Sequence, residues 1–259
     1  MEPLHKKLSN PNFYLIAFLV SFVLFNTLPI VFMISSSLVV EFQQPGFFIG
    51  FLRIISGLDD AAYTPTIVAV LNISQMLGEI LLAGLFVAVL WKVLVHDAKL
   101  AFKKENIGRN LLIILLGWVA IIVSSVVLEL LYERLGIEGT ANNQEIIETL
   151  LSYDSKIFMI ITVIILAPFV EEILFRKLLF GALEEKFHLS RLWAVIISAV
   201  LFAAVHGIDI FFFQYLALAL VISGAYALSN NNVVVSIGLH FVNNTLSIIL
   251  FFLAERLLS

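Results

Sequence analysis

The polar residues that could carry out chemistry lie in the C-terminal half of the chain, within stretches that are otherwise apolar. Two adjacent glutamates, Glu171 and Glu172, interrupt the run VEEILFRKLLF, and His206 ends the run LFAAVH. A second histidine, His240, lies with Asn244 in LHFVNNT. An ionisable group at the centre of a membrane span costs about 2.5–3.5 kcal/mol on insertion scales. We therefore expect these groups to serve a function.

The spacing around the two glutamates predicts separate roles for them. Glu172 and Arg176 are four residues apart, so on a helix they share one face and can form an ion pair. Glu171 is turned about 100° away from Glu172 around the same helix. Pro168, three residues before Glu171, should bend this helix and open space for water.

The remaining groups complete a set that could hydrolyse an amide or an ester. A carboxylate beside an imidazole can activate water, and Glu171 with His206 would do so. An imidazole and an amide NH2 can both donate hydrogen bonds to a developing oxyanion, and His240 lies one helical turn from Asn244. Phe202 lies one turn before His206 and would support it.

Zinc is the alternative to this metal-free arrangement. Two histidines and a glutamate are a reasonable ligand set for a catalytic zinc ion. The helical pattern H-E-x-x-H is absent, and the two histidines lie on separate apolar stretches. We therefore favour a site without a cofactor and keep zinc as the alternative.

Composition predicts that lipid surrounds these elements. The 259 residues are 61% hydrophobic and 13% charged, whereas a soluble domain carries about 25% charged residues. A membrane-spanning helix needs about 20 mostly apolar residues. The predicted fold is all-α, a polytopic transmembrane bundle of about seven to eight spans, with seven candidates at roughly 13–38, 66–91, 110–131, 157–179, 192–207, 210–228 and 233–253.

Two segments outside the seven predicted spans, and one acid inside a span, need separate predictions. The segment 41–65, which carries Asp59 and Asp60, is predicted to be interfacial or re-entrant, with an eighth span as the alternative. The acidic loop 133–156 is expected to hold a short helix. Glu79 lies inside the second predicted span, where it could form a structural pair or line a cavity. We expect one integral membrane unit, with N-terminal helices in 1–150 and a catalytic bundle in 151–259.

The distribution of basic residues predicts the orientation. With the N-terminus in the cytoplasm, eleven lysines and arginines fall inside and four outside, which agrees with the positive-inside rule. The eleven include Lys6 and Lys7. At 1.5 Å per residue, Glu171 would lie about 13 Å, His240 about 12 Å and His206 about 21 Å from the cytoplasmic boundary.

These residues resemble the three motifs of the CPBP family, which contains the type II CAAX prenyl endopeptidases and the bacterial Abi proteins. The motifs are E-E-x-x-x-R at Glu171, F-x-x-x-H at Phe202 and H-x-x-x-N at His240, all within about 155–250. The resemblance implies an intramembrane endopeptidase. Glu171 and His206 would activate water, His240 and Asn244 would form the oxyanion hole, and Glu172 and Arg176 would support the site. The family has been described both as metal-dependent and as glutamate-dependent.

Other functions remain open at this point. A non-catalytic membrane immunity or regulatory protein is the main alternative, and a proton-coupled carrier would also use buried Glu and His. Short loops and the lack of cysteine indicate a bacterial cytoplasmic membrane, where a membrane-associated peptide or protein is the expected substrate. The net charge of −4 gives no reason to expect nucleic acid.

Overall fold

The chain folds into a bundle of helices, and the prediction of an all-α protein is confirmed. The computed structural model describes residues 10–56 and 63–258, and no strand occurs among them. Lys6, Lys7, Asp59 and Asp60 lie outside the described residues. The helices are α2 (Pro11–Glu41), α3 (Phe47–Ile55), α4 (Pro65–Ala101), α5 (Lys104–Arg134), α6 (Asn142–Leu151), α7 (Lys156–Ile161), α8 (Ala167–Glu172), α9 (Phe180–Glu185), α10 (Arg191–His206), α11 (Phe212–Leu228) and α12 (Val233–Leu258), with π-helical turns η1 (Thr162–Leu166) and η2 (Ile173–Leu179).

All seven predicted spans correspond to helical segments, but two of them are short. Five apolar helices in the described part of the chain are long enough to cross a membrane: 12–41, 65–101, 104–134, 156–185 and 233–257. α10 and α11 have only 16 and 17 residues, which is below the length of about 20 that crosses the hydrocarbon. Large apolar side chains remain exposed along α5, including Leu111, Leu115 and Leu116. Lipid is the solvent that such a surface requires.

The segment between the first two long helices forms a short helix instead of an eighth span. Glu41 ends α2, and its carboxylate accepts hydrogen bonds from the backbone N–H groups of Gly46 at 2.8 Å and Phe48 at 2.7 Å. These bonds satisfy donors at the start of α3 that have no partner within the helix. Phe51 of α3 is buried against Ile67 of α4. A short helix is therefore present in this segment, and its interfacial or re-entrant position stays a prediction.

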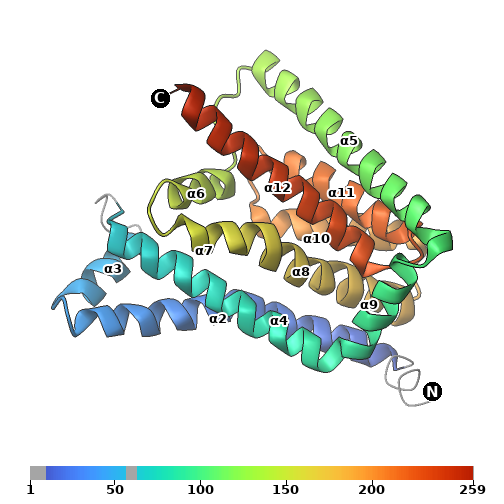
Figure 1. The fold of residues 1–259 in the computed structure, drawn as a ribbon, viewed down its shortest axis with the longest axis horizontal. Helices are drawn as coiled ribbons and strands as arrows, with labels where there is room; N and C mark the ends of the chain where they lie inside the picture. Colours follow the sequence, from blue (N-terminus) through green and yellow to red (C-terminus); the bar gives the residue numbers. More distant parts are fainter. Residues whose placement is uncertain (1–9, 57–62, 259) are drawn as a thin grey trace.

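Helices α2 and α4 pack closely along their length (Figure 1). Gly78 of α4 lies directly on Pro29 of α2, where a Cβ atom would come within 2.9 Å of the proline Cγ. Glycine therefore lets the two backbones approach here. The next residue along α4 is Glu79, so this contact fixes how Glu79 faces the rest of the bundle.

The fourth predicted span is one continuous helical segment, α7 to α9, with widened turns on both sides of α8. Pro168 is the second residue of α8, and it cannot donate a backbone hydrogen bond to the preceding turn. The π-helical turn η1 comes directly before α8, and η2 follows Glu172. Two π-helical turns therefore flank the two glutamates, and the bend expected at Pro168 stays a prediction.

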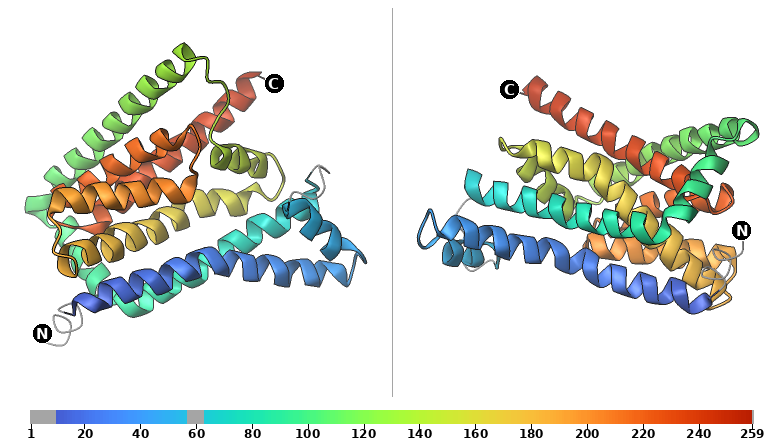
Figure 2. Two further views of the ribbon diagram at one scale, coloured as in Figure 1. Left: turned by 180° about the vertical axis from the view of Figure 1, so that it is seen from behind. Right: turned by 60° about the horizontal axis from the view of Figure 1, so that its bottom comes forward.

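The C-terminal helices enclose this central segment. α10 and α11 pack against each other, and α5 lies along α11 and α12 (Figures 1 and 2). The main buried cluster joins Leu82 and Phe86 of α4 to Val170, Phe175 and Phe202. Side chains from both predicted halves thus share one core. The start of α2 and the end of α12 lie at opposite ends of the bundle (Figure 1); which end faces the cytoplasm stays a prediction.

Candidate active site

A cavity of about 910 Å³ opens among α4, α6, α8, α10, α11 and α12. The four predicted catalytic side chains, those of Glu171, His206, His240 and Asn244, line this cavity. Phe202 lines it as well. The helix expected in the acidic 133–156 loop is α6, and it contributes Asn143 and Gln144 to the cavity wall. The sequence motifs therefore meet in one enclosed space, although they come from three separate helices.

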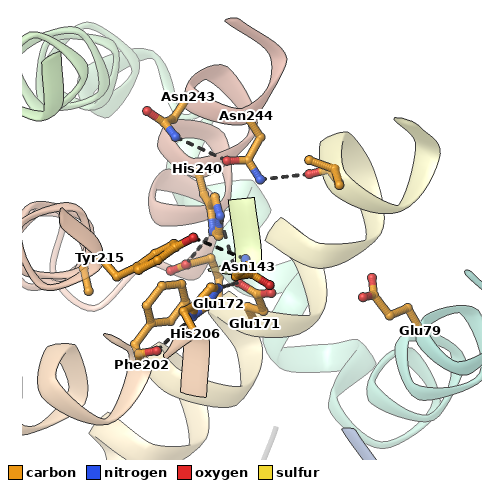
Figure 3. A network of polar contacts seen from close by, with 12 residues as sticks. Glu79, Asn143, Glu171, Glu172, Phe202, His206, Tyr215, His240, Asn243 and Asn244 are labelled. Carbon is orange, nitrogen blue, oxygen red and sulfur yellow. Dashed lines mark hydrogen bonds and ion pairs between the residues drawn. The ribbon is translucent and has the colours of Figure 1, made fainter. Parts of the chain in front are cut away.

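Glu171 lies opposite both histidines. Its Oε2 atom is 4.0 Å from Nε2 of His206 and 4.0 Å from Nε2 of His240. Its side chain is 10% exposed, so it contacts the cavity but little else. Figure 3 shows the carboxylate and the two rings gathered at one point of the cavity wall. A small polar molecule between them could contact all three groups.

His206 is held between two aromatic rings. Its ring stacks on Phe202 with centroids 4.4 Å apart and on Tyr215 of α11 with centroids 4.9 Å apart. Its Nδ1 atom lies 2.9 Å from the backbone oxygen of Phe202, which can only accept a hydrogen bond. Nδ1 must therefore carry the hydrogen, so Nε2 of the neutral ring faces Glu171 as an acceptor.

His240, Glu172 and Arg176 form a buried chain of polar contacts that lies behind the cavity. Nδ1 of His240 is 3.0 Å from Oε1 of Glu172, and Oε2 of Glu172 is 3.3 Å from Nε of Arg176. Both partners of that ion pair are fully buried. The Arg176 guanidinium also lies 4.4 Å from the ring centroid of Phe202. The predicted i, i+4 pair is present, and neither of its residues lines the cavity.

Asn244 lies in the cavity wall with part of its hydrogen-bonding capacity already in use. Its Nδ2 donates to the backbone oxygen of Val163 at 2.9 Å, and its Oδ1 accepts from Asn243 at 3.2 Å. An amide NH2 has two hydrogens, so one remains for a ligand. Val163 is in η1, where the widened turn leaves its carbonyl available to a side chain.

Glu79 lies across the cavity from Glu171, on α4 (Figure 3). Its side chain is buried, with 3% of the residue exposed. Gln75 Nε2 donates to its Oε1 atom at 2.8 Å. Its Oε2 atom has no hydrogen-bond partner. Of the two roles expected for Glu79, the cavity-lining position is the one observed.

Comparison with known proteins agrees with the motifs. Residues 153–246 match the family described as "Type II CAAX prenyl endopeptidase Rce1-like". A protein of Bacillus subtilis (strain 168) named "Putative membrane peptidase YdiL" is 31% identical over 150 residues. The resemblance to the CPBP family is confirmed. The match to YdiL covers 57% of this chain and 59% of that protein, and no solved structure matches the chain.

Metal ligands are not grouped in advance at this site among the described residues. Among the residues that the structure describes, no three histidine, cysteine, aspartate or glutamate side chains are grouped so that they could hold a metal ion. His240 uses its Nδ1 atom on Glu172, which leaves Nε2 as its only other donor atom. The zinc alternative therefore stays a prediction, and no step below depends on it.

Four contacts at the site are not part of the three motifs. Tyr215 stacks on His206 and is also within 3.4 Å of Asn143 Nδ2. Gln75 holds Glu79, and Asn243 holds Asn244. Asn243 and Asn244 are adjacent in the sequence, which was a usable signal. Gln75 lies four residues before Glu79 on α4, so its spacing was also a usable signal. Tyr215 lies on α11, and only the packing brings it to the site.

Proposed function

We propose that this protein is an intramembrane endopeptidase that hydrolyses a peptide bond in a membrane-associated peptide or protein. The observation that supports this most directly is the position of one Glu171 oxygen 4.0 Å from Nε2 of both histidines, inside a cavity of about 910 Å³. A carboxylate and an imidazole nitrogen that face the same small space can together accept the hydrogens of a water molecule and activate it. The membrane peptidase name of the relative supports the same activity class.

In the proposed reaction, Glu171 takes a proton from a water molecule that His206 helps to orient. The water oxygen bonds to the carbonyl carbon of the substrate, and the carbonyl oxygen becomes an oxyanion. When the carbon–nitrogen bond breaks, the proton held by Glu171 passes to the leaving amine. His206 can accept a hydrogen bond from the water through Nε2, because its Nδ1 hydrogen is committed to the Phe202 backbone oxygen.

The oxyanion would be stabilised by His240 and by the remaining N–H of Asn244. His240 uses its Nδ1 hydrogen on Glu172, so Nε2 can donate to an oxyanion only when the ring carries two hydrogens. The Glu172 carboxylate at 3.0 Å can offset the positive charge of that ring. Arg176 in turn balances Glu172, so the chain of charges supports the donor that faces the substrate.

The proposal is tested by peptide hydrolysis in liposomes. Wild-type protein would be reconstituted with synthetic single-span peptides, and the products identified by mass spectrometry. Glu171→Gln should abolish release, because the amide keeps the shape of the side chain and cannot act as the base. Glu133→Gln removes the same charge from an exposed position and should leave release unchanged. Equal product from wild type and Glu171→Gln would reject this function.

A further inference from the structure

The wall of the cavity opposite Glu171 carries an acid that the proposed mechanism does not use. Glu79 is almost completely buried, yet one of its carboxylate oxygens has no partner. Figure 3 shows its carboxylate turned toward the Glu171 side of the cavity. Burying a carboxylate without a full set of partners is costly. A protein that keeps one at such a position normally pairs it with a proton or with a positive group.

The cavity itself offers few positive groups to Glu79. Its lining includes three acids, Glu79, Glu129 and Glu171, and no lysine or arginine among the described residues. The other polar lining side chains include six amides, Gln75, Asn143, Gln144, Gln214, Asn243 and Asn244. The two histidines that line the cavity both have Nε2 4.0 Å from Glu171. The buried Arg176 is paired with Glu172 and does not line the cavity.

We infer that Glu79 determines specificity by binding a basic side chain of the substrate, a lysine or an arginine close to the bond that is cleaved. The unpartnered carboxylate oxygen is buried in the free protein, and bound substrate would bring the charged donor to it, while Gln75 donates to the other oxygen at 2.8 Å. Amide oxygens that line the same cavity can accept further N–H groups of the same cation. This inference rests on the proposed function, because it names the substrate class of the same cavity.

Glu79 is fixed in position by the backbone of α4. Gly78 contacts Pro29, and a residue with a Cβ atom there would come within 2.9 Å of that ring. Gly78, the residue before Glu79, is therefore packed tightly against α2. A fixed carboxylate favours a ligand at a defined distance from Glu171, so one position of the peptide should carry the preference.

Binding and cleavage are measured separately to test this. The probe is a series of apolar single-span peptides in which one lysine is moved along the sequence, each paired with a peptide carrying norleucine at that position. Binding is measured on the Glu171→Gln protein in liposomes, and cleavage on the protein with Glu171 intact. Glu79→Gln is combined with each, and Glu129→Gln, at an exposed position of the same cavity, is the matched control.

We expect one lysine position to bind about 10- to 100-fold more tightly than norleucine, as for a charge-assisted hydrogen bond. Glu79→Gln should remove this preference, and Glu129→Gln should keep most of it. A preference in binding without any cleavage would overturn the proposed peptidase function and leave the basic subsite standing. No preference at any position would overturn the subsite. The subsite would also be overturned if Glu79→Gln slowed cleavage of the lysine and norleucine peptides equally, because Glu79 would then act as a proton donor.

Discussion

The Nδ1 atom of His240 lies 3.0 Å from Oε1 of Glu172. The two adjacent glutamates therefore approach opposite sides of one imidazole, because Nε2 of His240 faces Glu171. The 100° turn between neighbouring helical residues makes this possible. One acid is left in the cavity for chemistry, and the other is buried where it can control the charge of the ring.

Removing the partner of Glu172 should destabilise the fold. Arg176→Ala leaves a fully buried carboxylate without its ion pair, which costs about 3–5 kcal/mol for a pair broken on one side. Thermal melts of the purified protein in detergent would measure the loss. Lys186→Ala, at an exposed position, is the control and should melt like wild type. An Arg176→Ala protein as stable as wild type would mean that the pair contributes nothing to the fold.

Close packing of α2 on α4 gives a second stability prediction. Gly78→Ala places a Cβ atom 2.9 Å from the Pro29 ring and should cost about 1–3 kcal/mol through overpacking. Gly84→Ala lies on the same helix with open space around its Cβ position, so it should be neutral or slightly stabilising. Melting curves of the two variants test the contrast. Equal curves would show that the helices can separate at little cost.

Tyr215 should act by positioning His206. Tyr215→Ala removes one face of the aromatic stack, and a displacement of about 1 Å can slow turnover by about 10²-fold. Tyr215→Phe keeps the ring and should retain most of the activity. The readout is kcat against KM on a cleaved peptide, since a positioning role lowers kcat with little change in KM. An equal loss in both variants would instead assign the effect to the hydroxyl group.

Some of this site could be predicted from sequence, and the reason is chemical. Glu171, His206 and His240 are costly in apolar stretches, and that cost predicted a function for them before the motifs were considered. Their depths could not be predicted, because a depth estimate from helix length assumes straight helices that cross the membrane. It set His206 about 8 Å apart from Glu171, whereas α10 has only 16 residues and brings His206 to 4.0 Å from that acid.

Other contacts had no sequence signal. Tyr215 is one of 29 tyrosines and phenylalanines, and nothing in its neighbourhood distinguishes the ring that stacks on His206. The π-helical turn at Val163 depends on how the chain accommodates Pro168, and it supplies the carbonyl that holds Asn244. Helix type and tertiary contact decide such features together, so a motif cannot specify them.

Asn244 provides a test of the oxyanion hole. Asn244→Ala should slow turnover by about 10²–10³-fold with little change in KM, because one donor to the oxyanion is lost. Asn243→Ala removes only the contact to Asn244 Oδ1 and should have a smaller effect. Kinetics with one peptide substrate compare the two. If both variants turn over like wild type, the oxyanion is stabilised by other groups.

The last prediction separates the two mechanisms by metal content. If Glu171 acts without a metal, the purified protein should carry far less than one zinc per chain, and cleavage should continue after dialysis against a strong chelator. If zinc is the electrophile, His206→Ala and His240→Ala should each lower the bound metal, and Asn244 should matter less because the ion would stabilise most of the developing charge. Elemental analysis of wild type and both variants measures the content directly. We favour the metal-free outcome because the helical pattern H-E-x-x-H is absent and a carboxylate with flanking hydrogen-bond donors suffices for the chemistry. One zinc per chain, lost together with activity on chelation and restored with it on adding zinc back, would reverse that choice.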